Sequence, residues 1–412
     1  MTDFQSLGLT DRLLERLAEM NLSNPTPIQE RAIPLVLQGR DVMGLAQTGT
    51  GKTAAFGLPL IQMLTGQRRK PAPRTVHALI LAPTRELAKQ IEANLMLFAR
   101  GTPTRVTVVT GGASLNAQAD RLSKGVDILV ATPGRLIDLL DRRAVVLSET
   151  RFLVLDEADH MLDMGFIHSL RQIAKLIPAK RQTMLFSATM PKLMAEIAAS
   201  YLTDPVRIEV APAGTPVEKI DQGVHFVTQG DKAKLLESYL DAHRDDRAIV
   251  FSRTKHGAEK LMKLLDSWGF AAGSIHGNKS QGQRDRALSE FKAGNLKVLV
   301  ATDVAARGID IPLVAHVYNY DLPNVPENYV HRIGRTARAG AEGRAVTLCA
   351  PAELDELKAV EKAIKRAIPV IGGAAWATTA PAGQPAKGKP GVKVARQRRR
   401  RPAGKPQARQ AA

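Results

Sequence analysis

Short apolar runs alternate with amphipathic stretches along most of the chain, with the lengths and periodicities of strands and helices. In the first half the strand-like runs are Val42–Leu45, Ala78–Ala82, Val106–Val109, Asp127–Ala131, Phe152–Leu155 and Thr183–Phe186. The helical stretches there are residues 5–20, Ile28–Gln38, Ala54–Leu64, Glu86–Arg100 and Arg135–Asp141. This alternation predicts a mostly parallel sheet with helices on both faces.

The same alternation repeats after a pause at residues 209–221, which hold two prolines and a glycine. The later strand-like runs are Ala248–Phe251, Gly273–His276, Val298–Ala301, Ala315–Tyr320 and Ala345–Cys349, and the helical stretches are His256–Trp268, Gln281–Ala293, Glu327–Arg335 and Ala352–Arg366. From residue 371 onward the chain has too little apolar surface to offset its ordering entropy. We predict an α/β protein with domains at 1–208 and 222–370, a linker at 209–221 and a disordered basic tail at 371–412.

Charge changes this picture more than the rest of the composition does. The net charge is +18, and residues 371–412 carry ten Lys and Arg but no acid, which leaves +8 on the first 370 residues. Both parts are basic, which favours a polyanionic partner. The lone Cys349 excludes an intrachain disulfide and a cysteine-ligated zinc site. No signal peptide or membrane-spanning run is recognisable, so we expect a cytoplasmic protein without a membrane partner.

A glycine-rich loop, Ala46–Thr53, follows the first strand-like run and precedes a helical stretch. Strand, loop, Gly-Lys-Thr and helix is the order of a phosphate-binding P-loop, although Ala46 stands where the usual first glycine is expected. Backbone N–H groups would face phosphate oxygens, Lys52 would contact the β- and γ-phosphates, and the Thr53 hydroxyl could ligate Mg²⁺. The alternative is a chance glycine-rich turn. The candidate phosphate-binding residues are Thr48, Gly49, Thr50, Gly51, Lys52 and Thr53.

Two acidic residues follow the apolar run Phe152–Leu155. Asp156 would hold Mg²⁺, and Glu157 would orient and activate the attacking water. Acidic residues after a strand are common, and by themselves they would fit a solvated charge run equally well. The P-loop elsewhere in the same predicted sheet favours the Walker B interpretation.

The motifs together resemble the DEAD-box ATP-dependent RNA helicase family, and the bacterial RhlE-type branch most closely. Asp156-Glu157-Ala158-Asp159 spells the tetrapeptide of the family name, and Ser187-Ala188-Thr189 matches its S-A-T motif. Residues 24–29 read N-P-T-P-I-Q, which resembles the Q motif, with Phe4 as its upstream aromatic. The resemblance spans residues 1–370 and implies two RecA-like domains that bind ATP and Mg²⁺.

The resemblance also assigns roles to single residues. Gln29 would read the adenine edge and Phe4 would stack on the purine, although Phe4 could instead pack against the first helix. Asp310 would contact the ribose, Arg335 and Arg338 would be arginine fingers, and Ser187 and Thr189 would couple hydrolysis to strand separation. The implied RNA-binding residues are Thr84, Arg85, Gly112, Thr132, Arg135, Thr254, Gln281, Arg284 and Thr302. Ala337 replaces a usual glycine, which matters only if that backbone needs a positive φ.

The function implied by the resemblance is ATP-dependent, local unwinding of short RNA duplexes by domain closure. Its RNA partners would be duplex and single-stranded RNA, which the protein would contact through the sugar-phosphate backbone. Its protein partners would be ribosome-assembly or RNA-degradation complexes. Two other functions remain open: a DNA-translocating helicase of the same superfamily, and an RNA clamp or annealing chaperone that acts mainly through the tail. The intact Lys52, Glu157, Arg335 and Arg338 argue against the clamp.

Overall fold

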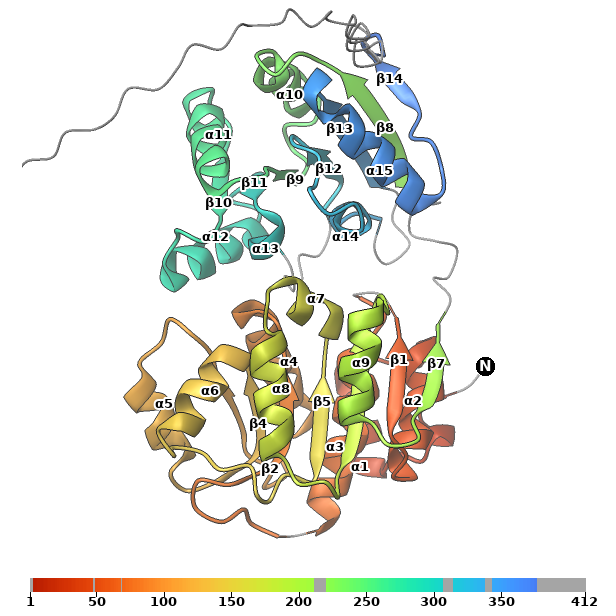
Figure 1. The fold of residues 1–412 in the computed structure, drawn as a ribbon, viewed down its shortest axis with the longest axis vertical. Coiled ribbons are helices and arrows are strands. Elements are labelled where there is room, and N and C mark those ends of the chain that lie inside the picture. Colours follow the sequence, from red (N-terminus) through yellow and green to blue (C-terminus); the bar gives the residue numbers. More distant parts are fainter. Residues whose placement is uncertain are drawn as a thin grey trace, which may run out of the picture. The chain divides into compact units, whose positions relative to one another are not determined.

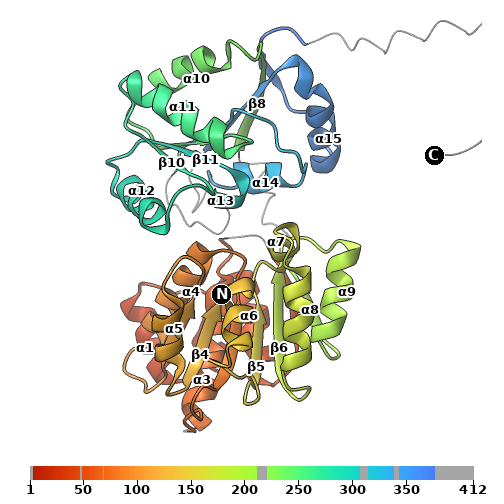
Figure 2. The ribbon, with the colours of Figure 1, turned by 60° about the vertical axis from the view of Figure 1, so that its left-hand side comes forward.

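Two parallel sheets with flanking helices form the body of the protein (Figures 1 and 2). The computed structural model describes residues 3–46, 49–67, 69–210, 220–306, 314–337 and 343–375. Within these residues each sheet has seven strands, and every strand pairing is parallel. The predicted α/β class is confirmed. None of the described helices has both the length and the apolar composition of a membrane span.

The first sheet has the strand order β3-β4-β2-β5-β6-β1-β7. Its strands are β1 (Val42–Leu45), β2 (Val76–Leu81), β3 (Val106–Val109), β4 (Val126–Ala131), β5 (Phe152–Leu155), β6 (Gln182–Ser187) and β7 (Val206–Glu209). The helices of this first domain are η1 (Gln5–Leu7), α1 (Asp11–Glu19), α2 (Pro27–Leu37), α3 (Lys52–Gln67), α4 (Arg85–Phe98), α5 (Leu115–Leu122), α6 (Pro133–Asp141), α7 (Ala158–Asp163), α8 (Ile167–Leu176) and α9 (Lys192–Tyr201).

The second sheet has the order β10-β11-β9-β12-β13-β8-β14. Its strands are β8 (Ile220–Phe226), β9 (Ala248–Phe251), β10 (Ala272–Ile275), β11 (Val298–Ala301), β12 (His316–Asn319), β13 (Gly343–Cys349) and β14 (Val370–Gly372). The helices of this second domain are α10 (Lys232–Asp241), α11 (Lys255–Ser267), α12 (Gln281–Ala293), α13 (Asp303–Ala306), α14 (Asn328–Ile333), η2 (Pro351–Glu353) and α15 (Leu354–Ile364). When the strands of each domain are counted from one to seven along the chain, both sheets have the same strand order.

Strand β2 shows why the sequence folds this way. All six of its residues are buried, and from Ala78 to Leu81 they alternate between the two hydrophobic cores of the first domain. Ala78 and Ile80 pack with helices α1–α4, whereas Leu79 and Leu81 pack with helices on the opposite face. A strand covered on both faces is a continuous apolar run, which is the pattern typical of parallel sheets.

The structure corrects several predicted boundaries. The helix predicted at residues 5–20 is divided into η1 and α1, because Gly8 ends η1 with a φ of 84°. The linker predicted at 209–221 is shorter, since Glu209 belongs to β7 and Ile220 begins β8. The tail predicted from 371 begins later, because β14 pairs with β8 and runs to Gly372. Residues 376–412, the rest of the predicted tail, lie outside the described residues.

Candidate functional site

The glycine-rich loop joins the end of β1 to the start of α3. Gly49 and Gly51 have φ values of 87° and 89°, in the left-handed region that favours glycine. A Cβ on Gly51 would lie 2.3 Å from Nε2 of Gln29, so a side chain there would force a rearrangement. Thr48, one of the predicted phosphate-binding residues, lies outside the described residues. The described part of the loop has the tight backbone turns that a phosphate-binding loop needs.

Lys52 begins α3, and its side chain is only 6% exposed. Its Nζ lies 3.6 Å from Oδ1 of Asp156 and makes no hydrogen bond among the described residues. A buried ammonium without hydrogen-bond acceptors is costly, so anionic oxygens would complete its environment. Thr53, the proposed Mg²⁺ ligand, is the next residue of the helix and is partly exposed.

Asp156 follows β5, and its backbone N–H donates to the carbonyl of Leu81 on β2 (3.0 Å). Burial raises the pKa of Asp156 to about 6, the ammonium of Lys52 opposes this rise, and the charge of Glu157 adds to it. The structure therefore brings together the lysine and the two carboxylates that the sequence places on separate elements.

Glu157 has a φ of 52° and a ψ of 50°, an uncommon backbone conformation for a residue with a side chain. Its Oε2 lies 3.0 Å from Nδ1 of His160, one turn along α7. Burial favours a higher pKa for Glu157, but the His160 hydrogen bond and the neighbouring positive charges outweigh it and hold the pKa below its usual range. Glu157 is therefore ionised, as a general base must be.

Asp159 links the acidic tetrapeptide to the S-A-T motif. Its Oδ2 accepts hydrogen bonds from the backbone N–H of Ala188 (3.2 Å) and from the backbone N–H and hydroxyl of Thr189 (both 2.9 Å). The hydroxyl of Ser187 donates to the carbonyl of Thr189 at 2.7 Å. Ser187 and Thr189 are thus joined to the acidic segment, through a residue to which the sequence analysis gave no role.

The predicted Q motif also contacts the loop. Gln29 Oε1 accepts from the backbone N–H of Thr26 at 2.9 Å, and Gln29 Nε2 donates to the carbonyl of Gly51 at 3.0 Å. One N–H and one oxygen lone pair of this amide remain for a ligand. Phe4 is 5% exposed and belongs to the hydrophobic core of the first domain, and its stacking on a purine stays a prediction.

The RNA-binding residues predicted in the first domain lie in neighbouring loops. Thr84 caps α4, with its hydroxyl accepting from the N–H of Leu87 at 3.2 Å, and Thr132 precedes α6. Gly112 has a φ of 80°, and a Cβ there would lie 2.2 Å from Nη1 of Arg85. Arg135 donates to the carbonyl of Ala113 at 3.0 Å. Arg85, at the start of α4, therefore lies against Gly112, and Arg135, near the start of α6, bonds the residue that follows this glycine.

The corresponding residues of the second domain contact the first through Glu86. Residues 1–375 form one compact unit. Glu86 Oε1 accepts from Gln281 Nε2 (3.1 Å) and lies 3.0 Å from Nη2 of Arg284. Arg85 Nη1 donates to Gln281 Oε1 at 3.3 Å. Glu86 is 8% exposed, and its pairing partners lie about two hundred residues away, so no local sequence pattern indicates this role.

Two other predicted residues of the second domain lie at the starts of helices. Thr254 caps α11 through the N–H of Gly257 (3.0 Å), and Thr302 follows β11 and directly precedes α13. Their hydroxyls therefore stand where strands end and helices begin, which is the placement that favours contact with phosphate. Asp310 lies outside the described residues.

Helix α14 ends at Ile333, shortly before the two predicted arginine fingers, Arg335 and Arg338. Arg332, which the sequence analysis did not select, is buried, and its Nε and Nη2 bond the carboxylate of Asp303 at 2.5 and 2.8 Å. Its Nη1 donates to the carbonyl of Asp321 (2.6 Å). Arg335 is 4% exposed, and its charge is among those that lower the pKa of Glu157. Arg338 lies outside the described residues.

A histidine pair joins the two sets of motifs. His160 Nε2 and His331 Nε2 are 3.3 Å apart, and their rings meet edge to face at a centroid distance of 4.5 Å. Through Nδ1 the same His160 contacts the Glu157 carboxylate. The sequence reasoning assigned no role to either histidine, although His160 directly follows the acidic tetrapeptide and His331 is four residues before Arg335.

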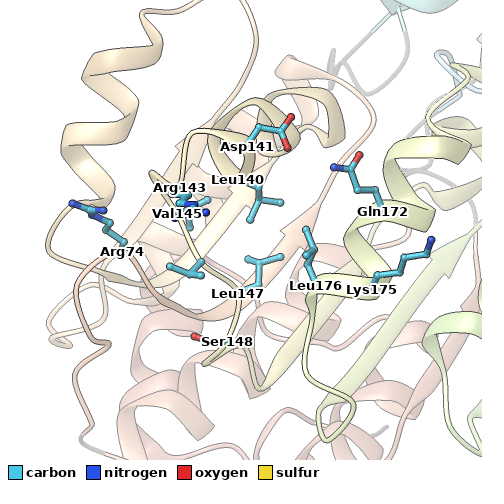
Figure 3. Close-up of a pocket in the computed structure, with 11 residues that line it drawn as sticks. Arg74, Leu140, Asp141, Arg143, Val145, Leu147, Ser148, Gln172, Lys175 and Leu176 are labelled. Atoms are coloured by element: carbon cyan, nitrogen blue, oxygen red, sulfur yellow. The ribbon is translucent and has the colours of Figure 1, made fainter.

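A separate hollow of about 610 Å³ lies on the first domain (Figure 3). Leu140, Leu147 and Leu176 form part of its lining, together with Arg74 and Lys175. The hollow adjoins the segments that precede β2 and β5, whereas the loop and the acidic residues follow β1 and β5. It therefore lies at the opposite, amino edge of the parallel sheet and is not part of the site described above.

Comparison with known proteins identifies the family. The chain matches the family model described as DEAD/DEAH box helicase over residues 26–197, and the helicase conserved C-terminal domain over residues 231–340. It is also 44% identical over 376 residues to the ATP-dependent RNA helicase CshA of Listeria monocytogenes, covering 91% of this chain and 71% of that relative. The chain belongs to the DEAD/DEAH box helicase family.

Solved structures of DEAD-box proteins share the architecture. The S. cerevisiae Dbp5 bound to RNA and ADP BeF3 aligns with a TM-score of 0.78 and 33% identity, covering 88% of this chain and 93% of that one. Mss116p bound to ssRNA and AMP-PNP aligns with a TM-score of 0.80 and 29% identity, covering 90% and 78%. The predicted tandem RecA-like domains are therefore confirmed. The assignment to the RhlE-type branch stays a prediction.

Proposed function

We propose that this protein is an ATP-dependent RNA helicase that hydrolyses ATP to ADP and phosphate and locally separates short RNA duplexes. The observation that carries the proposal is the buried cluster of Lys52, Asp156 and Glu157, in which the lysine Nζ makes no hydrogen bond among the described residues. A triphosphate supplies the anionic oxygens that this ammonium lacks. The family relationship and the RNA-bound structural relatives support the same activity.

The residues of the first domain would divide the work of hydrolysis. Lys52 would neutralise charge on the β- and γ-phosphates, and Gln29 would read the adenine edge with its remaining donor and acceptor. Thr53 and Asp156 would hold Mg²⁺, which supplies charge stabilisation on the phosphates when bound. Glu157 would accept a proton from the attacking water. The other nucleotide contacts would come from Phe4, Thr48, Gly49, Thr50, Gly51 and Asp310.

The second domain would complete the reaction. Arg335 and Arg338 would stabilise the charge that develops on the transferred phosphoryl group. Because Arg335 lies beyond the linker, catalysis would depend on the relative position of the domains. We keep the predicted division into domains at 1–208 and 222–370 with a linker at 209–221, with three adjustments. Glu209 belongs to the first domain through β7, Ile220 begins the second domain with β8, and β14 extends the second domain to Gly372.

The RNA would be held through its sugar-phosphate backbone. Thr84, Thr132 and Thr254 stand at helix N-termini, where phosphate is favoured, and Arg85 and Arg135 add positive charge beside them. The other contacts would come from Gly112, Gln281, Arg284 and Thr302. Such contacts carry little sequence information, so binding should be tolerant of sequence. Asp159 would connect this binding to hydrolysis, because it bonds Thr189 and lies two residues after Glu157 in the chain.

A strand-displacement assay tests the proposal. We expect a short RNA duplex to be separated only when ATP is present, and phosphate release to rise with RNA but not with DNA. Stimulation by DNA would favour the DNA-translocating alternative. Duplex annealing without phosphate release would favour the RNA clamp.

The basic tail is a further part of the proposal. We expect the ten charges of residues 376–412 to tether RNA without sequence preference. If roughly half of them contact phosphate, truncation after Ala375 should flatten the slope of log K against log salt by about 3 to 4. RNA affinity of the full-length and truncated proteins, measured across a salt series, checks this. Parallel slopes would leave the tail without a role in RNA binding.

We propose that this activity is cytoplasmic, which the similarity to the bacterial helicase CshA supports. Ribosome-assembly and RNA-degradation complexes are the candidate protein partners. Either would present structured RNA, which is the substrate that the proposed activity needs.

A further inference from the structure

A cluster of two histidines and one aspartate lies on the second domain, apart from the helicase motifs. His243 and Asp246 come from the segment between α10 and β9, and His316 is the first residue of β12 (Figure 1 labels these elements). Strands β9 and β12 are parallel neighbours, with Ala248 opposite His316. The cluster therefore lies at the amino edge of this sheet, whereas Thr254 and Thr302 follow strands at the carboxyl edge.

The potential ligand atoms of the three side chains lie within 4.8 Å of one another. His316 Nε2 is 3.0 Å from Oδ2 of Asp246, and His243 Nδ1 is 3.8 Å from the same oxygen. Bonds of about 2.0–2.2 Å to a common tetrahedral ion would place such atoms about 3.4 Å apart. The cluster is thus close to the size of a metal site.

The backbone around the cluster is fixed by hydrogen bonds. The N–H of Asp246 donates to the carbonyl of His243 at 3.0 Å, which closes a turn between the two ligands. The N–H groups of Ala315 and His316 donate to the carbonyl of Arg247 at 3.1 and 3.4 Å. The loop and the start of β12 are therefore held together before any ion binds.

One side chain must move to complete the site. The rings of His243 and His316 are stacked at a centroid distance of 4.3 Å with 26° between their planes, so the two lone pairs do not converge on one point. The His243 side chain is 35% exposed and can rotate, whereas the His316 side chain is only 10% exposed and is held against Asp246. A rotation of His243 alone would bring its nitrogen toward the shared oxygen.

The donor set selects the kind of ion. Two imidazoles and a carboxylate suit Zn²⁺ and other divalent transition metals, whereas Mg²⁺ prefers oxygen ligands alone. Arg344 on β13 is the strand partner of His316, and its positive charge disfavours a cation nearby. Its guanidinium is paired with Asp221 at 3.5 Å, which offsets that charge. Asp246 supplies the negative charge that compensates the ion.

We propose that His243, Asp246 and His316 bind one divalent transition-metal ion, Zn²⁺ by preference, at the edge of the second domain opposite to the helicase motifs. The three side chains leave a fourth position for water. The ion would pin the segment between α10 and β9 to the start of β12, and so stabilise the second domain. It would take no part in ATP hydrolysis.

The described residues hold one other cluster of three such ligands, Asp159, His160 and His331, within the helicase site. The test must therefore separate the two. Full-length protein is stripped of metal with EDTA and titrated with zinc chloride in a calorimeter, with melting temperature measured in parallel. We expect Asp246→Asn and His243→Ala each to weaken Zn²⁺ binding at this site by at least about tenfold and to remove the Zn²⁺-dependent rise in melting temperature.

Two control variants make the result specific. His256→Ala removes an exposed histidine outside both clusters, and His331→Ala removes a ligand from the other cluster. Both should keep the Zn²⁺ that Asp246→Asn loses. Asp246→Asn is nearly isosteric and keeps a hydrogen-bond acceptor for His316, so its fold can be verified by circular dichroism without metal. Equal Zn²⁺ affinity in wild type, His243→Ala and Asp246→Asn would overturn the proposal, as would the absence of Zn²⁺ binding by wild type.

Discussion

The two domains place a buried lysine at the same point of the same fold and use it differently. Lys52 begins α3 after the first strand of its domain, and Lys232 begins α10 after the first strand of the other. Each ammonium also faces the aspartate that follows the middle strand of its sheet, at 3.6 Å for Asp156 and 3.8 Å for Asp321. The matching strand order of the two sheets makes these pairs equivalent.

The two ammonium groups differ in the hydrogen-bond acceptors that surround them. Lys232 Nζ donates to Oε2 of Glu353 at 2.5 Å and to the carbonyl of Tyr320 at 2.6 Å, whereas Lys52 Nζ makes no hydrogen bond among the described residues. In the second domain a carboxylate from η2 therefore fills the position that a phosphate would take in the first. The same fold therefore leaves Lys52 available for a ligand, because no side chain of the described residues accepts its hydrogen bonds. It makes Lys232 part of a structural ion pair, because Glu353 accepts a hydrogen bond from it.

The largest expected effect concerns the charge that the second domain contributes to the first. Arg335→Ala should lower kcat by at least about 10³-fold, because a transition-state contact is lost while ATP binding stays nearly unchanged. Steady-state phosphate release and ATP titration of the full chain check this. Arg244→Ala removes the same charge from an exposed position at the amino edge and should have little effect. A loss below about tenfold in Arg335→Ala would exclude a transition-state contact.

The lysine comparison itself predicts opposite outcomes for matched changes. Lys232→Met should lower the free energy of unfolding of the second domain by about 3 kcal/mol, because it leaves Glu353 buried without its partner. Lys52→Met should abolish ATP binding yet destabilise the first domain less than Lys232→Met destabilises the second, because only the 3.6 Å ion pair with Asp156 is lost and no hydrogen bond is broken. Urea unfolding followed by Trp268 fluorescence reports on the second domain, and circular dichroism reports on both. Equal destabilisation by the two changes would refute the distinction.

The smallest expected effect concerns Ala337, which has a φ of 53°. Ala337 replaces a glycine that is usual at this position, and the replacement matters because the backbone has a positive φ here. Ala337→Gly should raise the free energy of unfolding by about 1 kcal/mol, because a Cβ is strained in the left-handed region. Ala287→Gly, in the helical backbone of α12, should shift it in the opposite direction by a similar amount. A decrease in both variants would show that no strain is relieved at Ala337.

Much of the fold could be predicted from the sequence, because the patterns that indicate it lie within short segments of the chain. Buried strands such as Phe152–Leu155 are continuous apolar runs, and the spacing of Gly49, Gly51 and Lys52 is set within one loop. Boundaries were less well predicted, since β14 exists only through its pairing with β8, far away in the chain.

The partners of the buried polar side chains could not be predicted from the sequence, because these contacts join distant segments of the chain. Glu86 resembles an ordinary helix residue in the sequence, and only the fold brings it to Gln281 and Arg284. Lys232 and Glu353 are 121 residues apart, and nothing near either residue indicates that both are buried. Composition gives the number of charges in the chain, but only tertiary structure decides which of them pair.

The most direct test of the account is phosphate release by Glu157→Gln. The amide cannot accept a proton from water, while the neighbouring Lys52 and Asp156 are left in place. RNA-stimulated turnover should be abolished in this variant, while ATP and RNA still bind in equilibrium titrations. Turnover within about threefold of wild type would contradict the assignment of Glu157 as the general base.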